Sequence, residues 1–113
     1  MKKLSATVIT LSGELGAGKT YFTKAFGKSL GIKEVINSPT YVIIKSYKLK
    51  SKHYEKLVHI DAYRLKNGKD LLKLGFMEII DNPKNLVVIE WPEIVEEIIP
   101  KNAIKLAIKG GII

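Results

Sequence analysis

The chain has 113 residues, no cysteine and two histidines, and 46% of its residues are hydrophobic. This length and composition predict a single domain over residues 1–113 with its own core, and they exclude disulfides, iron–sulfur clusters, thiol catalysis and a structural zinc site. The net charge of +8 suits an anionic partner such as RNA or a nucleotide, and it suits a general lysine bias equally well, since Arg64 is the only arginine.

A glycine-rich motif follows the first predicted strand. Residues 6–11 are apolar and β-branched, which is typical of a buried strand. A helix is predicted over residues 19–30 from its apolar spacing. Between them lies the pattern G-x-x-x-x-G-K-[ST], formed by Gly13, Glu14, Leu15, Gly16, Ala17, Gly18, Lys19 and Thr20. Because it lies between a strand and a helix, this pattern predicts a nucleotide-binding phosphate loop.

The chemistry of a bound triphosphate explains this spacing. Glycines allow consecutive backbone N–H groups to point at the phosphates, and the positive end of the helix dipole adds to the attraction. We expect Lys19 to contact the β- and γ-phosphates and the hydroxyl of Thr20 to bind Mg²⁺.

Thr40 lies in the turn-type sequence at 37–40, before a predicted strand over residues 41–50. It is either a switch residue that senses the γ-phosphate or Mg²⁺, or a plain turn residue. The lysines between residues 45 and 56 form either a solvated face or a contact for an anionic partner.

Two later apolar runs, at 57–60 and 86–89, end in the acidic residues Asp61 and Glu90. The carboxyl ends of parallel strands meet at one edge of the sheet, where ligands of open α/β sheets bind. One carboxylate would bind Mg²⁺, and the other would orient or deprotonate the attacking water. The spacing does not assign which does which. His59, by strand alternation, is either a buried core residue or part of this site.

Four ordered motifs, GELGAGKT, NSPTY, HIDAYRL and IEWPE, resemble those of the bacterial TsaE (YjeE) family over nearly the full length of the chain. Members of that family are small P-loop ATPases needed for threonylcarbamoyladenosine (t6A) modification of tRNA. The resemblance implies a cytoplasmic ATPase that uses ATP and Mg²⁺. It also implies two partners, a threonylcarbamoyl transferase subunit and its companion (TsaD- and TsaB-like proteins), with any contact to tRNA being indirect.

The resemblance assigns roles by position. It makes residues 13–20 the phosphate loop, Thr40 the switch residue and Asp61 the catalytic carboxylate, with Lys19 and Thr40 joining Asp61 in the catalytic set. Glu90 becomes the second Mg²⁺ ligand beside Thr20. Trp91 lies either beside the nucleotide or in the core.

The chain departs from the family pattern at both ends. Family members have another strand and helix before the phosphate-loop strand and a longer hairpin after residues 103–108. The shorter ends seen here predict an exposed sheet edge and leave the recognition of adenine open.

Other classes of nucleotide-binding protein fit less well. A kinase would need a lid with several arginines, and a GTPase would need the guanine-reading motif N-K-x-D, which is absent. The alternative that stays open is a nucleotide-gated binding module that docks on a partner or tRNA without hydrolysing ATP.

The order of elements predicts an α/β fold, a P-loop NTPase-like three-layer sandwich with a mostly parallel central sheet. Residues 41–50 are expected to pair antiparallel with the next strand. No apolar run is long enough to span a membrane and no signal peptide is evident, in agreement with a cytoplasmic location. The predicted strands are 6–11, 41–50, 57–60, 86–90 and 103–108, and the predicted helices are 19–30, 68–80 and 93–98.

Overall fold

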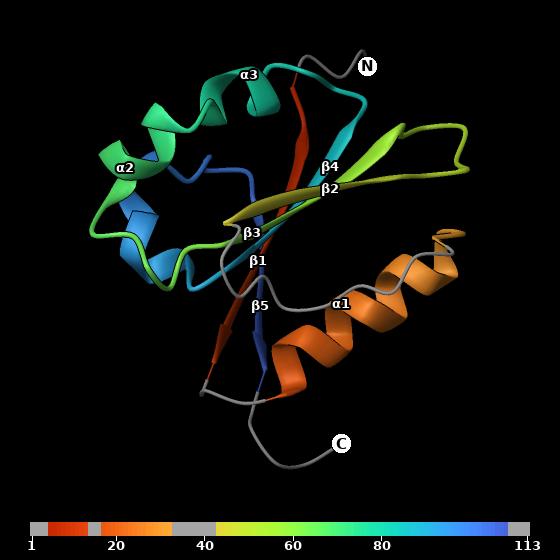
Figure 1. The fold of residues 1–113 in the computed structure, drawn as a ribbon, viewed down its shortest axis with the longest axis horizontal. Coiled ribbons are helices and arrows are strands. Elements are labelled where there is room, and N and C mark those ends of the chain that lie inside the picture. Colours follow the sequence, from red (N-terminus) through yellow and green to blue (C-terminus); the bar gives the residue numbers. More distant parts are fainter. Residues whose placement is uncertain (1–4, 14–16, 33–42, 109–113) are drawn as a thin grey trace.

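A computed structural model of the chain describes residues 5–13, 17–32 and 43–108, with the backbone alone for residues 17–21. These residues form five strands and four helical segments (Figure 1). In chain order they are β1 (Thr7–Gly13), α1 (Ala17–Ser29), β2 (Ile44–Lys48), β3 (Lys56–Asp61), α2 (Gly68–Lys73), α3 (Phe76–Ile80), β4 (Asn85–Glu90), the 3₁₀-helix η1 (Pro92–Ile98) and β5 (Ile104–Ile108).

One sheet holds all five strands, in the order β2-β3-β4-β1-β5. Strands β3, β4, β1 and β5 run parallel, and β2 pairs antiparallel with β3. The mostly parallel sheet and the β2–β3 hairpin are therefore confirmed. All six residues of β4 are buried, as expected for a strand with a parallel neighbour on each side and helices on both faces.

The sheet separates two hydrophobic clusters. On one face, Ile9, Leu57 and Val88 pack against Phe22 and other side chains of α1. The opposite face carries a cluster covered by α2, α3 and η1, which includes Val8, Val58, Val87, Leu71, Phe76 and Val95. Figure 1 shows α1 on one side of the sheet, with α2 and α3 on the other. The predicted three-layer sandwich is confirmed.

Two helical predictions differ from the structure in detail. Residues 68–80 form two short helices instead of one, because Gly75 between them has a φ of 92°. Glycine adopts this left-handed conformation without the steric cost of a Cβ atom. The segment after β4 is a 3₁₀-helix over Pro92–Ile98, preceded by Trp91 at φ 59°. No helix within the described ranges is long and apolar enough to cross a membrane.

Candidate functional site

The motif-bearing corner lies between β1 and α1. Strand β1 ends at Gly13 and α1 begins at Ala17, so the expected strand and helix flank the glycine-rich sequence. Gly13 has a φ of 141°, and a Cβ atom at this position would lie 2.1 Å from the carbonyl oxygen of Ile108 on β5. The close approach of β5 therefore requires a glycine where the chain leaves the sheet.

The first turn of α1 has the features of an anion-binding helix start. It comprises residues 17–20 and contains no acidic residue. The first backbone N–H groups of a helix have no partner within the helix, and its positive dipole end favours negative charge. The backbone at this corner is therefore suited to a phosphate group.

The two predicted carboxylates are neighbours at the same edge of the sheet. Asp61 at the end of β3 is the register partner of Glu90 at the end of β4. Glu90 is in turn the register partner of Leu11, two residues before Gly13 on β1. Register partners in a sheet project to the same face, and Leu11 belongs to the cluster under α1. Both carboxylates therefore start from the face that α1 covers, beside the end of β1.

Glu90 lies in a buried polar pair. Only 3% of its surface is exposed, and its Oε2 atom lies 2.5 Å from Nε2 of His59, which is fully buried. The sequence left two alternatives for His59, a buried core residue or a part of the site. The structure supports both, because His59 is buried in the core and contacts the site residue Glu90. The contact between His59 and Glu90 was not predicted from the sequence. The sequence did indicate that His59 lies on the same face as Asp61, because side chains alternate along a strand.

Backbone contacts hold the carboxylate of Asp61. The backbone N–H of Tyr63 donates to Oδ1 of Asp61 at 3.0 Å. The N–H of Ala62 donates to the carbonyl oxygen of Glu90 at 3.1 Å, which extends the β3–β4 pairing by one residue. The end of β3 is therefore anchored to the end of β4 at the residue that follows Asp61.

Trp91 packs on the other face of the sheet. Its half-buried side chain contacts the cluster under α2, α3 and η1, and its ring centroid lies 5.1 Å from that of the exposed Tyr63. Trp91 therefore packs against the core, which is one of the two alternatives left by the sequence. A place for Trp91 beside a nucleotide stays a prediction.

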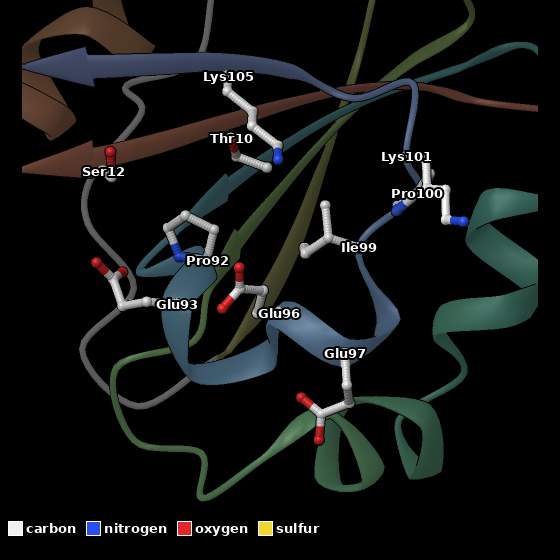
Figure 2. A pocket seen from close by; sticks show the side chains of 10 residues that line it. All are labelled: Thr10, Ser12, Pro92, Glu93, Glu96, Glu97, Ile99, Pro100, Lys101 and Lys105. Carbon is white, nitrogen blue, oxygen red and sulfur yellow. The ribbon is translucent and has the colours of Figure 1, made fainter.

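A cavity of about 410 Å³ lies on the face opposite the carboxylates. Figure 2 shows side chains from β1, η1 and β5 around it. Thr10 and Ser12 on β1 line this cavity, and they alternate with Leu11, whose side chain packs under α1. The cavity therefore does not include Asp61 or Glu90. The other lining residues are Pro92, Glu93, Glu96, Glu97, Ile99, Pro100, Lys101 and Lys105.

Several predicted site residues cannot be placed. Thr40 and residues 14–16 lie outside the described residues, as do the side chains of Lys19 and Thr20. Among the residues that the structure does describe, no three histidine, cysteine or acidic side chains converge on a possible metal position.

Comparison with known proteins shows what the chain resembles. The family model for "Threonylcarbamoyl adenosine biosynthesis protein TsaE" matches residues 1–111. The chain is 39% identical over 102 residues to the tRNA threonylcarbamoyladenosine biosynthesis protein TsaE of Bacillus subtilis, covering 90% of this chain and 61% of the relative. It is 36% identical to the Streptomyces coelicolor protein of that name, covering 93% of this chain and 70% of the relative.

A solved structure supports the same relationship. The crystal structure of B. subtilis YdiB superimposes with a TM-score of 0.72 and 34% sequence identity. The match covers 95% of this chain and 62% of YdiB. The chain thus spans less than two thirds of the length of the B. subtilis relative and of YdiB, at 61% and 62%.

Proposed function

The chain belongs to the TsaE family, and we propose that it binds and hydrolyses ATP with Mg²⁺ as an accessory protein in threonylcarbamoyladenosine formation on tRNA. One observation carries the proposal. The register of the sheet brings the ends of β1, β3 and β4 together, with Asp61 beside Glu90 and Glu90 beside Leu11. A phosphate loop with two carboxylates at its side is the arrangement that phosphoryl transfer to water needs.

The phosphate loop supplies the binding energy for the triphosphate. The backbone N–H groups of residues 13–20 would surround the phosphates, and Lys19 would add a charge-assisted contact to the β- and γ-phosphates. The acid-free first turn of α1 supports this role, since a carboxylate there would repel the anion.

The donor atoms around the site suit a magnesium ion. Mg²⁺ prefers oxygen ligands and is commonly held by one or two carboxylates together with substrate phosphates. Glu90 and the hydroxyl of Thr20 would contribute such oxygens. When bound, Mg²⁺ neutralises charge on the phosphate oxygens.

Asp61 would act on the attacking water. Its carboxylate is half-buried, and the N–H of Tyr63 fixes Oδ1. A carboxylate held in this way accepts a hydrogen bond from water in a constant direction, which orients the water for attack on the γ-phosphate. The switch role of Thr40 completes the proposed catalytic set.

The partners that we propose are a threonylcarbamoyl transferase subunit and its companion, similar to TsaD and TsaB. This proposal follows from family membership and from the names of the relatives, which place those proteins in tRNA threonylcarbamoyladenosine biosynthesis. The exposed lysines on β2 and in the following loop would make any tRNA contact electrostatic.

Release of phosphate tests the proposal. The purified protein is mixed with ATP and Mg²⁺, with and without the two partner proteins, and phosphate is measured over time, with Lys19→Ala as the control variant. We expect slow phosphate release by the protein alone and faster release with the partners. Lys19→Ala should release no phosphate under either condition. Binding of ATP without release under any of these conditions would favour the nucleotide-gated binding module instead.

A further inference from the structure

His59 and Glu90 form a buried pair that the proposed hydrolysis does not itself require. His59 is the register partner of Val88, so Glu90 lies two residues further along β4 on the same face. The Nε2–Oε2 distance is 2.5 Å, with 0% of the His59 side chain and 4% of the Glu90 side chain exposed. At this distance and burial the contact is a hydrogen bond in a low-dielectric environment, where such bonds are strong.

The other ring nitrogen of His59 identifies the proton donor. Nδ1 is buried and has no hydrogen-bond partner among the described residues. A proton on Nδ1 would leave a buried N–H group without an acceptor, which is costly and rare. A proton on Nε2 points at the carboxylate of Glu90 and leaves only an unshared electron pair on Nδ1. The geometry therefore assigns the Nε2–H tautomer, with His59 donating to the carboxylate of Glu90.

This bond fixes the orientation of a flexible side chain. A glutamate has three rotatable side-chain bonds, and holding them in one conformation has an entropic cost. The backbone of Glu90 is already held by the N–H of Ala62, and His59 holds the carboxylate end. Because Oε2 of Glu90 accepts the hydrogen bond from His59, Oε1 of Glu90 is the oxygen that remains to bind a ligand.

We infer that His59 is a positioning residue, which orients the carboxylate of Glu90 so that Oε1 faces a divalent ion bound with the nucleotide. This inference rests on the proposed function, in which Glu90 is a metal ligand. Ligating carboxylates are commonly oriented by a further hydrogen bond, and loss of such a partner typically lowers metal affinity by about 10- to 100-fold.

The test measures metal binding without turnover. The affinity for ADP is determined by calorimetry with Mg²⁺ and with EDTA. The dissociation constant in EDTA divided by the dissociation constant in Mg²⁺ gives the contribution of the metal. His59→Leu removes the donor at similar volume, and we expect the ratio to fall about tenfold or more, with the affinity in EDTA unchanged. His59→Gln keeps an N–H donor near the position of Nε2 and should retain most of the ratio.

A double variant shows whether His59 acts through Glu90. If it does, adding His59→Leu to Glu90→Gln lowers the ratio no further than Glu90→Gln alone. An unchanged ratio in His59→Leu, together with a reduced one in Glu90→Gln, overturns the positioning role and leaves the proposed function in place. An unchanged ratio in Glu90→Gln instead removes Glu90 from the metal site.

Nitrogen NMR provides a second test, and its first measurement uses the wild-type protein alone. With ¹⁵N-labelled histidine, we expect a proton on Nε2 of His59 and none on Nδ1. Addition of Mg²⁺ to the ADP-bound protein should shift the Nε2 resonance in the wild type and leave it in place in Glu90→Gln. A proton found on Nδ1 would overturn the inference.

Discussion

Asp61 and Glu90 are register partners on adjacent parallel strands, and the backbone N–H that follows Asp61 donates to the carbonyl oxygen of Glu90. The two acids are 29 positions apart in the sequence, as their numbers show, yet the sheet places them at one edge. Their environments differ, because Glu90 is buried against His59 while Asp61 is half-buried and bonded to the backbone of Tyr63. This difference favours separate roles for the two carboxylates.

Replacement of Asp61 by asparagine should separate binding from hydrolysis. Asn keeps the Oδ1 atom that accepts the N–H of Tyr63, so the turn after β3 is retained. It removes the negative charge that would orient the water, and we expect partner-stimulated phosphate release to fall by about 100-fold or more with ATP affinity preserved. Asp70→Asn is the matched control, because Oδ2 of Asp70 accepts the N–H of Lys66 at the start of α2. Unchanged release by Asp61→Asn would exclude the catalytic role.

Lys19→Ala should weaken the binding of ATP. Loss of a charge-assisted contact to phosphate costs about 1.5–3 kcal/mol, which corresponds to a rise of about 10- to 150-fold in the dissociation constant. Calorimetry measures this change. Lys28→Ala is the control, since Lys28 is an exposed residue in the last turn of the same helix. Equal ATP affinity in Lys19→Ala and wild type would refute the assigned contact.

Gly13→Ala should disrupt both the fold and the phosphate loop. A Cβ atom at Gly13 would meet the carbonyl oxygen of Ile108 at 2.1 Å, and the φ of 141° is strained for alanine. We expect a loss of stability of about 2 kcal/mol or more in denaturant unfolding, together with weaker ATP binding.

Gly31→Ala separates the two causes of that loss. Gly31 also has a positive φ, 87°, but a Cβ atom there would lie 3.6 Å from Cβ of Lys50, an ordinary contact. Its cost should be about 1 kcal/mol, from the backbone conformation alone. Equal losses in the two variants would show that the contact with Ile108 is unimportant.

The lysine face on the β2–β3 hairpin allows a test of tRNA contact. Lys48, Lys50 and Lys52 are exposed, and their replacement by glutamine removes three positive charges from the hairpin. If this face contacts tRNA, the slope of log affinity against log salt should become shallower by up to about three. Equivalent substitution of the exposed Lys66, Lys69 and Lys73 near α2 is the control. The same slope in the hairpin variant and wild type would assign this face to solvent.

Local patterns determined a large part of the architecture. The apolar runs near β1, β3 and β4 predict buried strands, because such runs bury both faces of a parallel sheet. The order of glycines, lysine and threonine predicts the strand-to-helix corner, since that spacing gives backbone N–H groups access to a phosphate. The break at Gly75 could not be predicted in the same way, because a glycine inside a helical pattern is often tolerated.

Only the tertiary structure decided which strands are neighbours and in which register. The chain itself determined that Asp61 and Glu90 end their strands, a property of local sequence. It did not determine that β4 lies between β3 and β1, or that Nε2 of His59 meets Oε2 of Glu90 across 31 positions, because strand pairing depends on the packing of the whole sheet. Contacts between residues distant in sequence form only when the helices on both faces fix the sheet, and the polar pair at its edge is a product of that packing.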